Sequence, residues 1–224
     1  MRDLDTFEIL PDEKDPVEEG IRMAGVPRRY RSASWSTWVS PPKLTPDLRE
    51  DLERLEAWGR AGEPPIVTLS GPPGSGKTHL ATATLRQVIE RRVAERGSWW
   101  DSVRWRSVAG LLERLRDELA GRAEGCGLGK VVSSAFLVLD DLGAVRETDW
   151  TIDRLSYLLS ARYDACRPTI ITTNLTLNEI AGRLDARIAS RLAEGFVVRI
   201  DLPDYRLLRP AHLAPGLDAR GVVQ

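Results

Sequence analysis

Four short runs of apolar or β-branched residues stand out along the chain, and in a fifth segment, at 103–106, apolar residues alternate with arginines. Longer amphipathic stretches separate most of these segments. Residues 66–69 and 135–139 are continuous apolar runs, which is the pattern of strands buried on both faces of a parallel sheet. The runs at 103–106, 169–174 and 196–200 also predict strands. Because helical patterns alternate with these strands, we expect an α/β fold in which a mostly parallel sheet carries helices on both faces.

Amphipathic helices are predicted at residues 45–59, 108–120 and 152–162, and directly after residue 76. In the first of them, Thr45 suits the N-cap and Pro46 the first helical position. Its apolar stripe consists of Leu48, Leu52, Leu55 and Trp58. The second is expected to bury Leu111, Leu112, Leu115 and Leu119. These stripes predict packing, not chemistry.

The stretch between the first strand and its helix fits the phosphate-binding pattern G-x-x-x-x-G-K-[ST] at every fixed position. It reads Gly71, Pro72, Pro73, Gly74, Ser75, Gly76, Lys77 and Thr78. Its glycines let main-chain N–H groups approach phosphates closely. Lys77 is expected to reach the β and γ phosphates of ATP, and Thr78 to bind Mg²⁺. His79 completes the expected nucleotide-binding residues. A chance match in a Gly/Pro turn is the alternative, but the order strand, loop, helix is the context that the motif requires.

Polar side chains end two of the predicted strands. Asp140 and Asp141 follow the apolar run at 135–139, and Asn174 ends the next strand. Ligands of α/β sheets bind at the carboxyl ends of the strands, so these residues are expected beside the phosphate loop. Asp140 would hold Mg²⁺ together with Thr78, and Asp141 would orient or deprotonate the attacking water. Asn174 would bind that water or the γ phosphate. Acids that merely cap a strand are the weaker alternative, because adjacent carboxylates repel each other without a cation.

Composition narrows the function classes. The chain has 224 residues, 42% of them hydrophobic, which suits one principal α/β domain. A formal net charge of −1 excludes a globally basic nucleic-acid binder. Cys126, Cys166, His79 and His212 show no zinc-ligand spacing, so no zinc is expected. Without a signal-peptide pattern or an apolar run of membrane-spanning length, we expect a soluble, cytoplasmic protein with no membrane partner.

The amino-terminal residues change character abruptly. Residues 1–23 are rich in acids and poor in aromatics, and Pro16 is expected to break any helix, so a flexible tail is predicted. The segment 24–35 is basic, and we expect it to form a partly docked loop. A sharper hypothesis places Tyr30 or Trp35 near the adenine of the nucleotide.

A local positive charge lies between Arg86 and Arg116, where eight arginines stand against four acidic residues. With Trp99, Trp100 and Trp105 nearby, this region is the best candidate for a surface that binds single-stranded DNA. A solvated pair of helices with core tryptophans explains the pattern equally well.

These motifs together resemble the AAA+ ATPases of the DnaC-type helicase loaders and the related IstB-type transposition ATPases. Besides the phosphate loop, the resemblance rests on AGVPRRY at 24–30, LDDLG at 139–143, TTNL at 172–175, RIASRL at 187–192 and PDYR at 203–206. It implies the strand order 5-1-4-3-2. It also implies that Asn174 is the first sensor and that Arg191 is an arginine finger, which reaches the ATP of a neighbouring subunit. Arg187, one helical turn earlier, is the alternative finger.

The resemblance further implies an ATP-dependent homo-oligomer that engages single-stranded DNA and a replicative helicase. It places the ATPase domain at residues 24–206 and a tail at 207–224. Two features depart from the pattern. Helicase loaders carry an amino-terminal helicase-binding domain, whereas few residues precede 24 here, and many AAA+ proteins carry a carboxy-terminal lid, which we do not expect in this chain.

Four functions stay open at this point. The first is a DnaC-like ATPase that loads or remodels a helicase on single-stranded DNA, which segment 24–35 favours. The second is an IstB-like helper that binds duplex DNA and recruits a transposase. The third is a small-molecule kinase, which would hydrolyse little ATP without its acceptor. The fourth is a nucleotide-gated scaffold with low turnover, because Asp141 stands where these ATPases more often carry Glu.

Overall fold

The computed structural model describes residues 15–39, 44–95, 102–122 and 127–208. At its centre lies a five-stranded sheet in the order β2-β3-β4-β1-β5, and every neighbouring pair is parallel. The strands are β1 Ile66–Ser70, β2 Val103–Ser107, β3 Phe136–Asp140, β4 Thr169–Thr173 and β5 Phe196–Arg199. The expected α/β class, the parallel sheet and the strand order 5-1-4-3-2 are thus confirmed.

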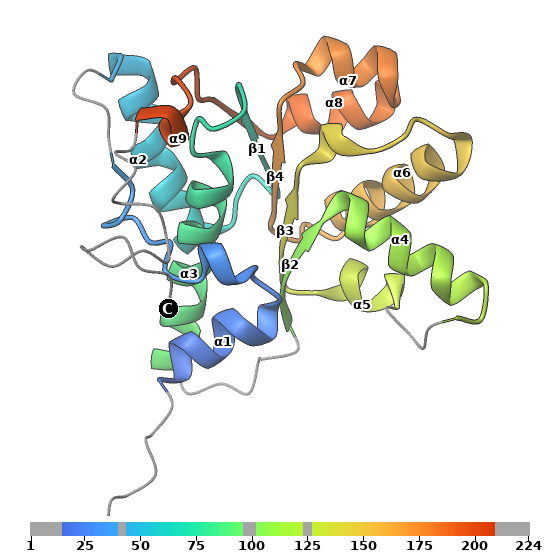
Figure 1. Ribbon diagram of the computed structural model, residues 1–224, viewed down its shortest axis with the longest axis horizontal. Helices are drawn as coiled ribbons and strands as arrows, with labels where there is room; N and C mark the ends of the chain where they lie inside the picture. The colour runs from blue at the N-terminus through green and yellow to red at the C-terminus, as the bar shows by residue number, and fades with distance from the viewer. Residues whose placement is uncertain (1–14, 40–43, 96–101, 123–126, 209–224) are drawn as a thin grey trace, which may run out of the picture.

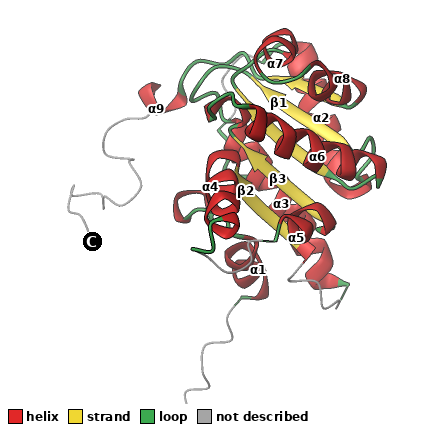
Figure 2. Ribbon diagram, turned by 90° about the vertical axis from the view of Figure 1, so that its right-hand side faces the viewer, coloured by secondary structure: helices red, strands yellow, loops and turns green. Residues whose placement is uncertain are grey.

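Helices cover both faces of this sheet (Figures 1 and 2). On one face lie α1 Pro16–Ala24, α2 Pro46–Ala61 and α3 Lys77–Ala94. On the other lie α4 Val108–Leu119, α5 Leu128–Ser133, α6 Asp149–Asp164, α7 Leu177–Arg183 and α8 Ala186–Glu194. Two short 3₁₀ helices, η1 Arg28–Tyr30 and η3 Leu142–Ala144, and the short helix α9 Tyr205–Leu208 complete the described chain. Among the described helices, none combines the length and the apolarity that crossing a membrane requires.

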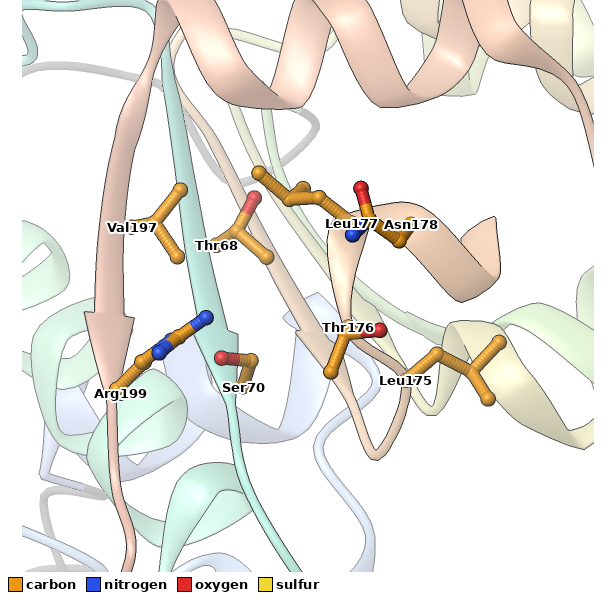
Figure 3. A pocket seen from close by; sticks show the side chains of 8 residues that line it. All are labelled: Thr68, Ser70, Leu175, Thr176, Leu177, Asn178, Val197 and Arg199. Carbon is orange, nitrogen blue, oxygen red and sulfur yellow. The ribbon is translucent and has the colours of Figure 1, made fainter. Parts of the chain in front are cut away.

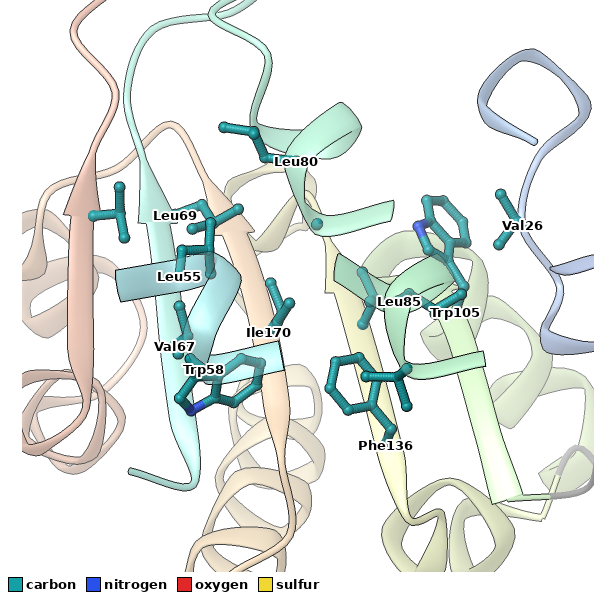
Figure 4. Packing of buried hydrophobic residues seen from close by; sticks show 14 of the residues in the cluster. Val26, Leu55, Trp58, Val67, Leu69, Leu80, Leu85, Trp105, Phe136 and Ile170 are labelled. Carbon is teal, nitrogen blue, oxygen red and sulfur yellow. The ribbon is translucent and has the colours of Figure 1, made fainter. Parts of the chain in front are cut away.

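The three inner strands β1, β3 and β4 contribute to two separate cores, because successive side chains of a strand point to opposite faces. Val67 and Leu69 pack beneath α2 and α3 (Figure 4). In the same core, the rings of Trp58 and Phe136 lie 5.7 Å apart between centroids. Ile66 faces the other way and packs with α6 and α8. The sheet is therefore covered on both sides, as its continuous apolar strands predict.

The boundaries of α2 follow from its sequence. The Thr45 hydroxyl accepts a hydrogen bond from the backbone N–H of Leu48 at 3.3 Å, and Pro46 occupies the first turn. The helix ends before Gly62, which adopts the left-handed conformation that favours glycine. All four residues of the predicted apolar stripe are buried. The predicted helix is confirmed and extends two residues further, to Ala61.

The amino-terminal prediction is wrong for residues 16–23. Pro16 does not break a helix but begins α1, because a proline at the first helical position lacks only an N–H that has no helical partner there. The Asp15 carboxylate caps the helix by accepting a hydrogen bond from the backbone N–H of Val17 at 2.8 Å. Ile21 and Ala24 are buried in the core with α3. The rest of the predicted tail, residues 1–14, lies outside the described part.

Leu119 also differs from its prediction. It is 73% exposed rather than buried, because it is the last residue of α4 and the end of that helix passes beyond the core. Leu111, Leu112 and Leu115 are buried as predicted. The predicted absence of a carboxy-terminal lid concerns residues beyond α9, which lie outside the described part.

A fully buried cation, Arg162 of α6, joins the helix to the sheet. Its guanidinium donates hydrogen bonds to the backbone carbonyls of Val131, Val132, Ser134 and Pro168, at 2.7–3.1 Å, and to the hydroxyls of Ser134 and Thr169. Burial lowers the pKa of Arg162 to about 9, so the side chain still carries its charge at neutral pH. One side chain therefore satisfies carbonyls of two chain segments, residues 131–134 and Pro168.

Candidate nucleotide-binding site

The predicted phosphate loop connects β1 with α3 at the carboxyl edge of the sheet. Gly74 has a φ of 77°, in the left-handed region that favours glycine. A Cβ atom at this position would overlap the Asp204 carboxylate, and the backbone N–H of Tyr205 donates to the Gly74 carbonyl at 3.0 Å. The carboxy-terminal segment before α9 therefore lies directly against the loop, a contact that the sequence did not reveal.

Lys77 is the first residue of α3 and turns back across the loop. Its ammonium group donates to the carbonyls of Gly71 at 2.8 Å and Pro72 at 2.7 Å. Burial lowers the pKa of Lys77, whereas the nearby carboxylates of Asp141 and Asp140 raise it. The loop and the two acids thus share one electrostatic environment.

Thr78 and Asp140 meet although they lie on different elements. The Thr78 hydroxyl donates to Asp140 Oδ1 at 2.8 Å, and the Thr172 hydroxyl donates to the same oxygen at 2.7 Å. Asp140 is only 8% exposed, and burial raises its pKa, while the two hydroxyl hydrogen bonds lower it. The structure brings together the two residues that the sequence assigned to Mg²⁺.

Asp141 follows in the left-handed conformation, with a φ of 63°. Its side chain is exposed, and its backbone N–H donates to the Thr172 hydroxyl at 2.9 Å. Thr172 therefore contacts both acids, but the sequence analysis gave it no role of its own. The available signal was its place one residue before the end of β4, which pairs with β3.

Replacing Thr172 by valine is expected to weaken Mg²⁺-dependent ATP turnover about 10- to 100-fold, because Asp140 loses one of its two orienting hydroxyls. The measurement is the ATPase rate as a function of Mg²⁺ concentration. Thr173→Val is the matched control, since among the described residues the Thr173 hydroxyl accepts a hydrogen bond from the backbone N–H of Leu175 and has no contact with either acid. An unchanged Mg²⁺ dependence in Thr172→Val would show that Asp140 needs no support from β4.

Asn174 lies beside the acidic pair. It directly follows β4 and is exposed, and a Cβ atom on Gly143 would overlap its side-chain oxygen. Gly143 therefore allows Asn174 to approach the segment that follows Asp141. The loop, Asp140, Asp141 and Asn174 all lie at the same edge of the sheet.

The two candidate arginine fingers do not join this group. Arg191 stacks over Tyr163 of α6, with 5.7 Å between Cζ and the ring centroid. Gly195, just after α8, contacts the backbone of Ile66, the first residue of β1, whereas the phosphate loop follows the last residue of that strand. The strand separates these ends by about 13 Å at about 3.3 Å per residue. Arg187 is exposed one turn earlier on α8.

The amino-terminal segment packs on the other side of the loop. The His79 side chain contacts the Ser34 carbonyl at 3.0 Å, and burial lowers the pKa of His79. The Trp38 ring lies against Gly76, and Trp35 packs against the core of α2 and α3. The sequence analysis missed Trp38. The proposed contacts of Tyr30, Trp35 and His79 with a nucleotide stay predictions.

The predicted DNA-binding region is partly used inside the protein. Trp105 is buried, and Arg106 donates to the Ala24 carbonyl at 3.0 Å. Arg86 binds the carbonyls of Ala33 and Arg31 and pairs with Glu18. These three residues are therefore structural, because the amino-terminal segment covers them. Trp99 and Trp100 lie outside the described residues.

The donor set fits a nucleotide with Mg²⁺. Mg²⁺ prefers oxygen ligands, and the Thr78 hydroxyl and the Asp140 carboxylate supply them side by side. The loop glycines keep the backbone open to phosphate groups. Within the described ranges no group of three or more His, Cys, Asp or Glu residues is arranged to hold a metal ion. Thr78 and Asp140 are therefore the residues that would hold Mg²⁺ beside a bound phosphate.

A parallel sheet of this order, with a phosphate loop after β1, two acids at the end of β3 and an asparagine after β4, defines an ATP-binding P-loop protein of AAA+ architecture. The sequence model of the family described as "IstB-like ATP binding protein" matches residues 16–200, so the chain belongs to that family. The suspected relationship is confirmed.

Three relatives show the range of the family. The ATP-binding protein Rv3427c in an insertion sequence of Mycobacterium tuberculosis is 29% identical over 91% of this chain and 82% of its own length. The replicative helicase loader DnaC of Escherichia coli is 27% identical over 56% of this chain, and the match spans 49% of DnaC. A crystal structure of the DnaC helicase loader, 28% identical, superposes with a TM-score of 0.65 over 78% of this chain and 100% of that chain.

Proposed function

We propose that this protein binds Mg²⁺·ATP and hydrolyses it, and that it couples this cycle to work on DNA. The observation that carries the proposal is the 2.8 Å contact between Thr78 and Asp140, at the mouth of a complete phosphate loop. The Thr78 hydroxyl and the Asp140 carboxylate thus place two oxygen ligands of the kind that Mg²⁺ prefers side by side, next to this loop.

Each residue of the site has a distinct task. The loop N–H groups and Lys77 hold the phosphates, while Thr78 and Asp140 hold the metal ion. Bound Mg²⁺ would neutralise charge on the β and γ phosphates as the bond between them breaks. Asp141 orients the attacking water or accepts its proton, and Asn174 fixes that water from the neighbouring strand.

Asp141→Asn is expected to bind Mg²⁺·ATP normally but to hydrolyse it about 10²- to 10⁴-fold more slowly, because the group acting on water loses its charge. Asparagine also tolerates the left-handed backbone at this position, so the fold should be kept. Nucleotide affinity and single-turnover hydrolysis are the two measurements. Asp153→Asn, an exposed acid on α6, is the control. Loss of nucleotide binding in a folded Asp141→Asn protein would mean that the two acids have exchanged roles.

We also propose a homo-oligomer in which an arginine of one subunit completes the ATP site of the next. The support is geometric, since Arg191 and Arg187 lie on α8, away from the phosphate loop of their own subunit. An arginine on the neighbour would supply transition-state charge only after assembly. ATP turnover per subunit should therefore rise with protein concentration, whereas that of a small-molecule kinase should not.

The DNA substrate distinguishes the two remaining roles. A helicase loader would act on single-stranded DNA, and a transposition helper would bind duplex DNA and recruit a transposase. The match to Rv3427c extends over 91% of this chain, whereas the match to DnaC extends over 56% of it. These proportions favour the transposition helper.

Binding to single strands and duplexes of equal length, with ATP and with ADP, tests this choice. Salt dependence should accompany either mode, because phosphate contacts release counterions. Higher affinity for single strands in the ATP state would favour the helicase loader instead.

A further inference from the structure

A second polar pocket, of about 210 Å³, opens on the sheet face that carries α7 and α8 (Figure 3). It lies opposite the face on which α3 packs. Thr68 and Ser70 of β1 and Val197 and Arg199 of β5 form its floor, since Thr68 pairs with Val197 and Ser70 with Arg199 in the register of the two strands. Residues 175–178, between β4 and the first turn of α7, form the opposite wall.

Four of the five polar side chains that line this pocket have no partner among the described residues, whereas the fifth, Thr176, is hydrogen-bonded to Glu179. Thr68 is fully buried, and its hydroxyl makes no hydrogen bond. In Figure 3 this hydroxyl points from β1 into the space below Leu177. The side chains of Ser70, Asn178 and Arg199 also form no hydrogen bond or ion pair within the described ranges. A buried hydroxyl without a partner is rare in folded proteins, which indicates that something else completes it.

The hydrogen-bond donors that line the pocket favour an anionic ligand. A guanidinium offers only donors, and hydroxyl and amide groups can donate as well. No acidic side chain lines the pocket. The volume corresponds to about seven water molecules at about 30 Å³ each, which admits a small group but not a nucleotide.

The apolar side chains of the wall further restrict which kind of anion fits the pocket. Leu175, Leu177 and Val197 line the same space as the polar groups. A phosphate would contact a single cationic side chain in this pocket, Arg199, and would make no favourable contact with the apolar wall. A carboxylate on a short carbon stem uses both, because its oxygens match the guanidinium and its stem covers the apolar wall.

We propose that this pocket binds a carboxylate on a short carbon stem, either a free small acid or a glutamate side chain of a bound protein. The Arg199 guanidinium and the Ser70 and Thr68 hydroxyls donate to its oxygens. The pocket lies on the sheet face opposite α3, and its Ser70 directly precedes the phosphate loop.

The test uses the full chain carrying Lys77→Ala, so that the phosphate loop does not hold the probe. Propionate, which matches the glutamate side chain, and acetyl-Ala-Glu-Ala-amide are titrated by ligand-observed NMR. Arg199→Met should weaken binding about tenfold or more by removing the charged donor. Arg49→Met, an exposed arginine of α2, should leave binding unchanged.

Thr68→Val gives a second readout. It should weaken carboxylate binding yet raise the Tm of the free protein, because a buried unpartnered hydroxyl is replaced by a methyl group of the same size. A merely structural hydroxyl would lower the Tm when removed.

Four outcomes decide the proposal. Binding of propionate that Arg199→Met weakens supports a free acid as ligand. Binding of the Glu peptide alone, with no binding of its Gln counterpart, supports a protein side chain. Tighter binding of inorganic phosphate than of propionate overturns the carboxylate assignment. Absence of binding by both carboxylate probes overturns the site.

Discussion

Arg191→Ala is expected to bind ATP like the wild type and to lose about 10³- to 10⁵-fold in turnover, the range that arginine fingers contribute by stabilising transition-state charge. The structure holds Arg191 over Tyr163, and its Nε is buried without a hydrogen-bond partner. The Arg191 side chain therefore loses few interactions when it turns toward the ATP site of a neighbouring subunit. Steady-state ATPase assays with saturating nucleotide measure the effect, and Arg187→Ala is the matched comparison on the same helix.

Mixing Arg191→Ala with Lys77→Ala provides the decisive experiment. In a head-to-tail assembly, an intact phosphate loop on the Arg191→Ala subunit can face an intact arginine on the Lys77→Ala subunit. Activity should return in part, although each variant alone is inactive. If the two variants co-assemble and no mixing ratio restores turnover, the finger is another residue, and Arg187 becomes the candidate.

The second large effect concerns stability. Arg162→Met is expected to lower the free energy of unfolding by about 3–5 kcal/mol, because four backbone carbonyls and two hydroxyls lose a charged donor inside the protein. Such a loss is a large share of the total stability of a domain, which is about 5–15 kcal/mol. Urea unfolding followed by circular dichroism measures the change.

Arg154→Met controls for removing an arginine from the same helix, because Arg154 is exposed. It should unfold at the wild-type urea concentration. Equal midpoints for Arg162→Met and Arg154→Met would mean that water replaces the guanidinium at no cost.

Much of the fold could be read from the sequence, because buried parallel strands are continuous apolar runs. β1, β3, β4 and β5 lie where runs of apolar and β-branched residues predict them, and β2 lies where apolar residues alternate with arginines. The order of the strands came from the family resemblance, since pairing depends on contacts between distant segments.

The structural role of Arg162 was not predicted, because a charged helical residue is usually exposed. Its spacing of three and four residues after Leu159 and Leu158 placed it on the buried face all the same.

The residues of the site could be predicted where a sequence motif specifies a single residue. The phosphate loop, Asp140 and Asn174 all lie at the carboxyl ends of parallel strands. The topology therefore predicts that they share one edge of the sheet. Thr172 could not be assigned, because its role depends on the register between β3 and β4. For a similar reason, the sequence left two interpretations of the arginines at 86–116 open. Sequence shows their charge but not the carbonyls of the amino-terminal segment that Arg86 and Arg106 bind.

The docking of α1 also sets where an independently folding fragment must begin. A protein cut at residue 24, where the family resemblance starts, would lose Ile21 from the core and Glu18 from its pair with Arg86. Asp15 caps α1 and therefore belongs to the same folded unit. Amide protons of the α1 helix should therefore exchange with solvent as slowly as those of α3, and a protease should spare this stretch until the whole domain opens.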